Sequence, residues 1–208
     1  MRWMTRLSVW LLALITFCGM VGCSSLQTWP SLPSQTLTER SFYDNILIQG
    51  RFSVAYEQNN RPQSVQGRFQ WQQQGQRIDI DLMSPLGQTM AKLAITPNLA
   101  TIQQTGKEIK SAPNIAELTE QTLGWSLPVA GMRDWLQGFH RSTSNQRQLV
   151  RPNENDQFDS EGWHIHYVSW QQNSVSAYPK RIDLTRTSPQ LHQLSLRIII
   201  DQWEPQGR

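Results

Sequence analysis

Hydrophobic and polar residues alternate through most of the chain beyond residue 45. The clearest example covers residues 65–82, where two alternating segments flank a Gln74-Gly75 pair. Their shared apolar face contains Phe69, Trp71, Ile78, Ile80 and Leu82. Side chains in a strand point alternately to opposite faces, and glycine favours tight turns. The pattern therefore predicts an antiparallel hairpin with one apolar face.

The same alternation predicts further strands on both sides of this hairpin. Before it, the apolar positions are Ile46, Ile48, Phe52, Val54 and Tyr56. After it, they include Trp163, Ile165, Tyr167, Ile182, Leu184, Leu194, Leu196, Ile198 and Ile200. We also expect strands at residues 88–95, 99–103 and 107–110, and a weak strand near residues 148–151. Successive antiparallel strands with one apolar face are typical of a single sheet rolled into a barrel or half-barrel.

Helical spacing of apolar residues interrupts the strands in the middle of the chain. It predicts one helix at residues 115–124 and a second that begins after Ser126, each ending at a glycine, Gly124 and Gly138. Their apolar positions are Ile115, Leu118, Val129, Met132, Trp135 and Leu136. A third, short amphipathic helix is expected at residues 37–45. The predicted fold class is therefore mainly β with a few short helices (α+β), in which a curved, open sheet receives the helices.

A leucine lies near the tip of a predicted turn. In the sequence Ser84-Pro85-Leu86-Gly87, Pro85 fixes φ and Gly87 tolerates positive φ, which together explain the chain reversal. Neither explains Leu86, because short turns at a sheet edge usually carry polar residues. One interpretation is that Leu86 folds back on the core. The other is that it is exposed for a purpose.

The first 22 residues have the composition of an export signal. Arg2 and Arg6 precede the apolar run at residues 7–20, and small residues follow it. The run is too short for an ordinary membrane span, so we expect residues 1–22 to be removed. Their loss takes away two arginines and no acid, which lowers the net charge from +3 to +1. A chain with so small a net charge is not typical of a nucleic-acid binder that relies on counterion release.

Cys23 would then be the first residue of the mature chain. The sequence Met20-Val21-Gly22-Cys23 resembles a bacterial lipobox, with methionine in place of the usual leucine. This resemblance implies that Cys23 is diacylated on sulfur and acylated on its amino group; the alternative is an ordinary signal with a coincidental cysteine. By resemblance to enterobacterial sorting rules, an aspartate at the next position would favour inner-membrane retention, but that residue is Ser24. We therefore expect a lipid anchor at the periplasmic face of the outer membrane.

The segment after the cysteine is expected to be a tether. Residues 24–36 are rich in serine and proline and show no apolar period. The predicted organisation is a signal peptide at residues 1–22, a lipidated cysteine and flexible tether at 23–36, and one domain at 37–208.

Candidate catalytic and metal sites are weak. His164 and His166 share a strand face and could hold zinc, but no third ligand is evident. Asp79 and Asp81 could serve glycoside chemistry, but Arg77 precedes them in the same row, as in an ordinary charged strand face. A glycine-rich phosphate loop and a G-x-S-x-G motif are both missing from the sequence. We therefore predict no enzyme activity, no metal and no cofactor.

Three motifs in order, RFQWQQQGQ, DLMSPLGQTMAKL and LTEQTLGWSLPVAGMRDWLQG, resemble those of the LolB family of outer-membrane lipoprotein receptors. The similarity extends from about Gly50 to Trp203 and is weakest at residues 145–160. The resemblance implies an incomplete antiparallel barrel with a hydrophobic cavity capped by helices. It implies acceptance of lipoproteins from the soluble periplasmic carrier LolA through their acyl chains, and their insertion into the outer membrane.

The resemblance also assigns roles to residues. The turn Pro85, Leu86 and Gly87 corresponds to the family's protruding hydrophobic loop, which implies contact with outer-membrane phospholipid. Candidate residues lining the acyl-chain cavity lie on the predicted apolar faces: Phe52, Val54, Phe69, Trp71, Ile80, Leu82, Trp135 and Ile198. We expect a monomer that binds no nucleic acid.

Two other functional classes remain open from the sequence. A lipid-anchored structural or assembly β-domain would have a fully packed interior and no ligand. An envelope hydrolase would need a cleft that joins the aspartate or histidine pair to a nucleophile or metal.

Overall fold

The computed structural model describes residues 39–58, 61–172, 177–188 and 192–207. The predicted signal peptide, Cys23 and the predicted tether lie outside these residues.

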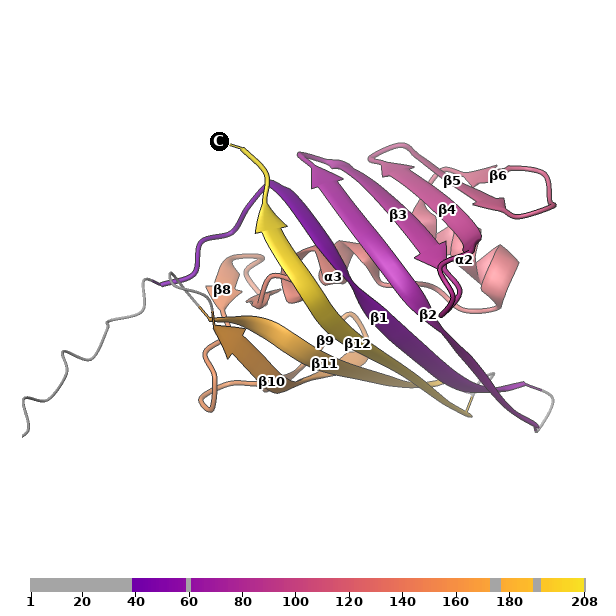
Figure 1. Cartoon of the computed structure of the whole chain (residues 1–208). Coiled ribbons are helices and arrows are strands. Elements are labelled where there is room, and N and C mark those ends of the chain that lie inside the picture. Colours follow the sequence, from indigo (N-terminus) through magenta and orange to yellow (C-terminus); the bar gives the residue numbers. More distant parts are fainter. Residues whose placement is uncertain (1–38, 59–60, 173–176, 189–191, 208) are drawn as a thin grey trace, which may run out of the picture. The chain divides into compact units, whose positions relative to one another are not determined.

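Ten strands of the described residues form one antiparallel sheet (Figure 1). The strands are β1 (Asn45–Gln58), β2 (Arg61–Gln74), β3 (Arg77–Met83), β4 (Thr89–Thr96), β5 (Leu99–Gln104), β6 (Lys110–Ala112), β9 (Gln157–Ser160), β10 (Trp163–Gln172), β11 (Ala177–Ser188) and β12 (His192–Pro205). Their spatial order is β6-β5-β4-β3-β2-β1-β12-β11-β10-β9. The two edge strands β6 and β9 do not pair with each other, so the sheet is not closed. The predicted incomplete barrel and α+β fold class are confirmed.

The predicted hairpin at residues 65–82 is formed by β2 and β3. Trp71 lies opposite Ile80 and Phe69 opposite Leu82, so the apolar side chains of the two strands share one face. Gly75 takes φ +58° in the connecting turn, a conformation that glycine adopts without steric cost. Alternation in the sequence therefore predicted both the pairing and the buried face.

Two glycines make room for phenylalanine rings on this inner face. Gly50 on β1 lies opposite Phe69 on β2, and Phe52 lies opposite Gly67. A Cβ atom at Gly50 would lie 2.1 Å from the carbonyl oxygen of Ile199 and 2.9 Å from the Phe69 ring. A Cβ at Gly67 would lie 2.8 Å from the Phe52 ring. Each ring thus covers a glycine of the neighbouring strand, which brings the strands and rings into close contact.

Helices α2 (Ile115–Leu123) and α3 (Val129–Trp135) lie against one side of the sheet (Figure 1). Asn114 caps α2 by accepting a hydrogen bond from the Glu117 backbone N–H at 2.9 Å. Gly124 ends the helix in the left-handed conformation, as predicted. Within the described residues, neither helix has the length and apolar composition needed to span a bilayer.

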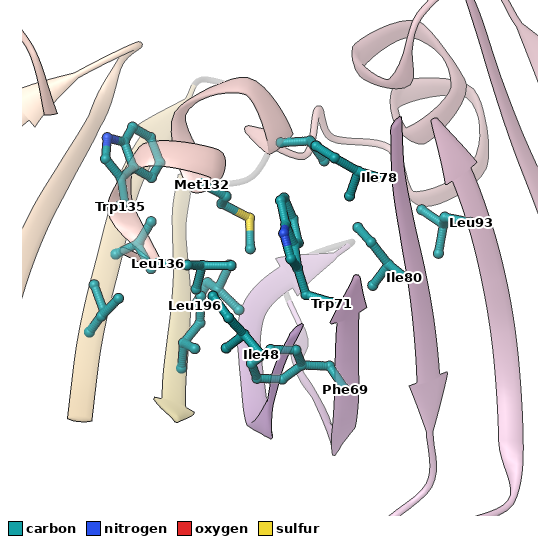
Figure 2. Close-up of a cluster of buried hydrophobic side chains, with 14 of the residues drawn as sticks. Ile48, Phe69, Trp71, Ile78, Ile80, Leu93, Met132, Trp135, Leu136 and Leu196 are labelled. Carbon is teal, nitrogen blue, oxygen red and sulfur yellow. The ribbon is translucent and has the colours of Figure 1, made fainter. Parts of the chain in front are cut away.

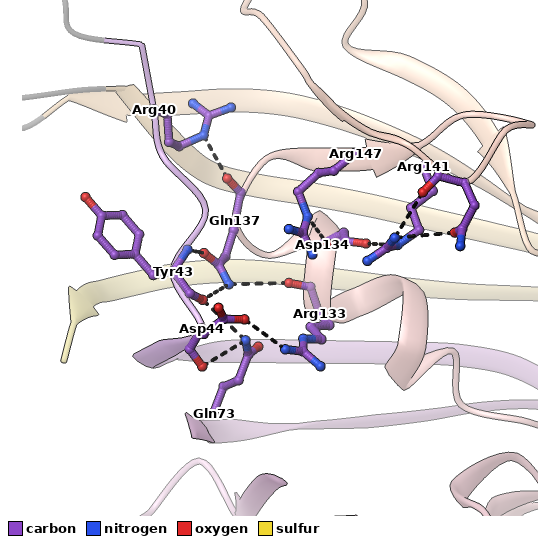
Figure 3. A network of polar contacts seen from close by, with 10 residues as sticks. Arg40, Tyr43, Asp44, Gln73, Arg133, Asp134, Gln137, Arg141 and Arg147 are labelled. Carbon is purple, nitrogen blue, oxygen red and sulfur yellow. Dashed lines mark hydrogen bonds and ion pairs between the residues drawn. The ribbon is translucent and has the colours of Figure 1, made fainter. Parts of the chain in front are cut away.

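The predicted helix at residues 37–45 is wrong in its described part, which has no helical turn before β1. The backbone of Tyr43 is bound instead by the buried side chain of Gln137 (Figure 3). The Tyr43 N–H donates to Gln137 Oε1 at 2.9 Å, and Gln137 Nε2 donates to the Tyr43 carbonyl at 3.0 Å. A helix would use these backbone groups internally, so the tertiary contact replaces helical bonding.

Strand boundaries differ from the prediction in the less regular segments. The expected strand at residues 107–110 is instead β6, which begins at Lys110, because the chain leaves the turn at Thr105-Gly106 through irregular residues before it pairs with β5. The weak strand near 148–151 is β8 (Arg147–Leu149), and it pairs with β7 (Phe139–Arg141), which was not predicted. Strand β9 was also missed, because its sequence is largely polar.

Candidate functional site

A largely apolar cavity of about 450 Å³ lies between the sheet and the helices. Its wall comes from strands β1 to β5, from β12, and from α2, α3 and the segment between them. The lining residues are Phe52, Val54, Tyr56, Val65, Phe69, Trp71, Ile80, Leu82, Met90, Ala91, Leu93, Ile102, Gln104, Thr122, Leu123, Trp125, Leu127, Met132, Leu196 and Ile198. Protein interiors normally contain few voids larger than a water molecule, so a space of this size is unusual for a simple core.

Seven of the eight residues proposed from the sequence line this cavity. They are Phe52, Val54, Phe69, Trp71, Ile80, Leu82 and Ile198. All seven belong to strands, where alternation fixes which side chains point inward. Their contact with a ligand remains a prediction.

Trp135 is not among the lining residues, although the sequence placed it there. It is 1% exposed and packs against its own helix, where a Cβ atom at Gly131 would lie 2.3 Å from the indole ring. Met132 of the same helix points towards Trp71, whereas Trp135 lies farther from it (Figure 2). The apolar stripe of α3 is therefore wider than the part that meets the cavity, and Trp135 belongs to the packed core.

Several lining residues were not proposed from the sequence. Ala91, Leu93 and Ile102 continue the inward alternation on β4 and β5, so the same pattern identifies them. Trp125 and Leu127 come from the connection between the two helices. That connection has no period, and only the tertiary structure places its side chains against the sheet.

One part of the cavity wall is open to solvent. Val65, Met90 and Leu123 line the cavity and remain 36%, 39% and 40% exposed, which is high for large apolar side chains. They come from β2, β4 and α2. We interpret these three residues as the rim of the cavity, where an apolar ligand would enter and displace water from apolar surface.

Among the described residues that line the cavity, none is an aspartate, glutamate, lysine, arginine or histidine. Gln104, Thr122 and Tyr56 supply its polar side chains. An ionic group placed inside would lose its hydration without gaining a partner, which costs several kcal/mol or more. The cavity therefore suits alkyl chains, and any charged headgroup would remain at the rim.

Leu86 is 91% exposed, which overturns the interpretation that it folds back on the core. The Gly87 N–H donates to the Ser84 carbonyl at 2.9 Å, which closes a β-turn with Pro85 and Leu86 at its centre. The Ser84 N–H donates to the Gln88 carbonyl at 2.8 Å and joins the turn to the hairpin of β3 and β4. The turn is held firmly while its leucine points into solvent.

The end of α3 away from the rim is fixed by a buried arginine. Arg40 Nε donates to the Gln137 carbonyl at 2.7 Å, and its terminal nitrogens donate to the carbonyls of Gly138, Val150 and Ala177. Burial lowers the pKa of Arg40 to about 10, so it stays charged at neutral pH. Among the described residues, this charge binds backbone carbonyls and no carboxylate, and it attaches the segment before β1 to the residues that follow α3 and β8 and to the start of β11.

The alternative chemical sites are engaged in surface contacts. His164 Nδ1 lies 2.8 Å from Asp159 Oδ1, and Asp79 forms a two-point ion pair with Arg77 at 2.7 Å. Within the described ranges, no group of three or more His, Cys, Asp or Glu side chains is placed to hold a metal. Neither residue pair lines the cavity.

Comparison with known proteins agrees with this architecture. The family described as outer membrane lipoprotein LolB matches residues 44–203. The outer-membrane lipoprotein LolB of Cupriavidus metallidurans is 37% identical over 199 residues, covering 92% of this chain and 94% of the relative. That of Cupriavidus necator is 40% identical over 159 residues, covering 75% and 79%.

The similarity extends to a LolB protein of a second genus. The outer-membrane lipoprotein LolB of Nitrosococcus oceani is 31% identical over 218 residues, covering 98% of this chain and 99% of the relative. A crystal structure of a LolA superfamily protein from Nitrosomonas europaea aligns with a TM-score of 0.48 and 9% identity, covering 81% of this chain and 89% of that one. With its family match over most of the folded residues and these close relatives, the chain belongs to the LolB family of outer membrane lipoproteins.

Proposed function

We propose that this protein receives lipoproteins from the periplasmic carrier LolA by enclosing their acyl chains, and then inserts those chains into the outer membrane. Membership of the LolB family makes the chain a component of lipoprotein localisation at the outer membrane. The observation that supports the finer mechanism is the cavity, which is uncharged, apolar and open at one rim. A structural domain that binds no ligand would be expected to pack its interior without such a space.

The energetics of this proposal are those of apolar transfer. Each methylene removed from water is worth about 0.8 kcal/mol, so acyl chains cannot cross the periplasm unprotected. Transfer without a nucleotide must run downhill from a weaker to a stronger apolar environment. A loosely filled cavity can bind acyl chains more strongly than the carrier and less strongly than the bilayer, because it shields the chains from water without packing as densely as a protein core.

Delivery would use a different part of the molecule from reception. The rim formed by Val65, Met90 and Leu123 receives the chains, whereas Leu86 stands exposed on its own turn. One leucine entering a bilayer gains about 1.5–3 kcal/mol, which suits reversible contact rather than permanent attachment. Permanent attachment is assigned to acylated Cys23, and the tether at residues 24–36 lets a monomeric domain approach the membrane.

The anchor makes a direct chemical prediction. We expect the mature chain isolated from membranes to begin at Cys23 and to carry acyl groups on both its sulfur and its amino nitrogen. Intact-mass and N-terminal peptide measurements would detect them. An unmodified Cys23, or a mature chain that begins elsewhere, would contradict the anchor.

The proposed function is tested by reconstituted transfer. A purified carrier loaded with an acylated lipoprotein is mixed with the full mature chain, and cargo is followed first to the chain and then to liposomes. We expect the cargo to move to the chain without nucleotide and to reach the liposomes only when the chain is present. Cargo that stays on the carrier, or moves to liposomes equally well without the chain, would refute the proposal.

A further inference from the structure

A row of arginines crosses the outer face of the sheet and leads to the turn that carries Leu86. The strand registers place Arg68 opposite Arg51, Arg51 opposite Ile199, and Ile199 opposite Arg181. On its other side, Arg68 lies opposite Met83, the last residue of β3 before the turn. Residues directly opposite in an antiparallel sheet share a face and lie about 4.5–5.5 Å apart. Arg68 is therefore the member of the row nearest to the turn.

Two carboxylates neutralise only part of this row. Arg51 forms a two-point ion pair with Asp201, with both N–O distances 3.0 Å. Asp183 accepts hydrogen bonds from both Arg181 and Arg197. Among the described residues, no ion pair or side-chain hydrogen bond is found for the exposed Arg68. Asp201 compensates the charge of Arg51, so Arg68 is the arginine of this row whose charge is left available to an added anion.

The row borders a groove of about 420 Å³ that reaches the turn itself. It is lined by Arg51, Phe52, Ser53, Gln66, Gly67, Arg68, Pro85, Arg197, Ile199 and Asp201. Three arginines and one aspartate give this lining a net positive charge. Pro85, the residue before Leu86, forms one of its walls. The cationic groove and the exposed leucine are thus parts of one continuous surface.

We propose that this groove binds the phosphate of an anionic phospholipid headgroup while Leu86 enters the bilayer. A guanidinium group presents donors in a planar fork that matches phosphate oxygens, which suits Arg68 as the principal ligand. The proposal rests on the membrane contact of Leu86 proposed above and adds the lipid class that the contact selects. Insertion of Leu86 supplies a small apolar contribution to the binding free energy. The groove adds an electrostatic contribution that depends on the charge of the headgroup.

The test uses the full mature chain with Cys23→Ala, so that its own acyl anchor does not hold it to membranes. Flotation measures its partition onto vesicles of phosphatidylcholine alone and onto vesicles that also contain phosphatidylglycerol. We expect a preference for the anionic vesicles that weakens at high salt. Arg68→Gln should reduce that preference about five-fold, which corresponds to the ~1 kcal/mol gained by a basic residue near an anionic membrane.

Arg77→Gln is the control for distance from the turn, because it removes one exposed arginine, which pairs with Asp79, from the start of β3. Met83 lies six residue steps beyond Arg77, or about 20 Å along the strand. This exceeds the Debye length of about 10 Å in ordinary salt, so Arg77→Gln should keep the preference. An equal loss of the preference for anionic vesicles in Arg68→Gln and Arg77→Gln would refute binding in the groove and indicate only a general effect of net charge.

Two further arms separate this inference from the proposed function. Leu86→Glu should lower partition onto both kinds of vesicle; if it has no effect on either, the membrane contact itself fails. If Leu86→Glu acts as expected but Arg68→Gln does not change the preference, only the groove fails. Saturable binding of inorganic phosphate that Arg68→Gln abolishes, without a vesicle preference, would assign the groove to a soluble anion and refute the lipid headgroup.

Discussion

Leu86→Glu is expected to lower the delivery of captured lipoprotein to liposomes at least ten-fold, while capture from the carrier changes less than two-fold. Leu86 is 91% exposed and does not line the cavity, so its replacement removes no core packing. Loss of a leucine from the bilayer costs about 1.5–3 kcal/mol, and a carboxylate in its place adds a further penalty. A ten-fold change corresponds to about 1.4 kcal/mol, so the expected loss meets or exceeds it.

The control variants for this position keep its hydrophobicity. Leu86→Ile and Leu86→Phe should deliver cargo nearly as well as the wild type, because both retain an apolar side chain at the tip of the same turn. The thermal midpoint of all three variants should match the wild type. If Leu86→Glu loses capture as much as delivery, or unfolds the domain, the residue belongs to the receiving site or to the core.

Ala91→Trp is expected to weaken acyl binding by about fifty-fold without unfolding the protein. Ala91 is 6% exposed and lines the cavity on β4, opposite Leu82. An indole ring at this position can occupy the empty space, which excludes part of the acyl chain. If three methylenes are displaced at about 0.8 kcal/mol each, the loss is about 2.4 kcal/mol. Titration with a fluorescent acyl probe would measure it.

The matched control lies on the same strand but on its other face. Ala94 is half-buried, lies outside the cavity lining and is opposite Asp79 on β3. Ala94→Trp should therefore bind acyl chains with nearly wild-type affinity. Equal binding by Ala91→Trp and the wild type, with both proteins folded, would mean that acyl chains do not enter this cavity.

Alternation in the sequence predicted the sheet and most of its inner face because each strand has a regular period of two. Once Trp71 is assigned to the inner face, the positions of Phe69, Ile80 and Leu82 follow from the hairpin. The glycines also had predictable roles as turn and helix-end residues, as at Gly75 and Gly124. Local patterns were sufficient here because each residue's neighbours in sequence determine its face.

Prediction failed where a distant partner determines local structure. The segment before β1 has a helical pattern, but two tertiary contacts bind it to the residues after α3. Its Arg40 side chain donates to the Gln137 carbonyl, and its Tyr43 N–H donates to the Gln137 side chain. Trp135 fits an apolar helical stripe, yet the sequence does not give the angle at which α3 meets the sheet, and only Met132 reaches the cavity. The exposure of Leu86 was equally undetermined, since a leucine in a turn can fold either way.

The row of arginines on the outer face could not be predicted from the sequence either. Arg51, Arg68 and Arg181 come from three different strands, and each looks like an ordinary solvent-facing residue on its own strand. Their alignment depends on strand register, including the irregularity between Gln49 and Gly50. Only the assembled sheet brings the three side chains into one row beside the turn.

The measurement that most directly tests the central claim locates bound acyl chains within the folded protein. A lipopeptide with a photoreactive group at the end of its acyl chain is bound to the mature chain and irradiated, and the modified peptides are identified by mass spectrometry. The account predicts adducts on cavity-lining positions such as Trp71, Ala91 and Trp125, with a large decrease in Ala91→Trp. Adducts confined to the outer face of the sheet or to the Leu86 turn would contradict it.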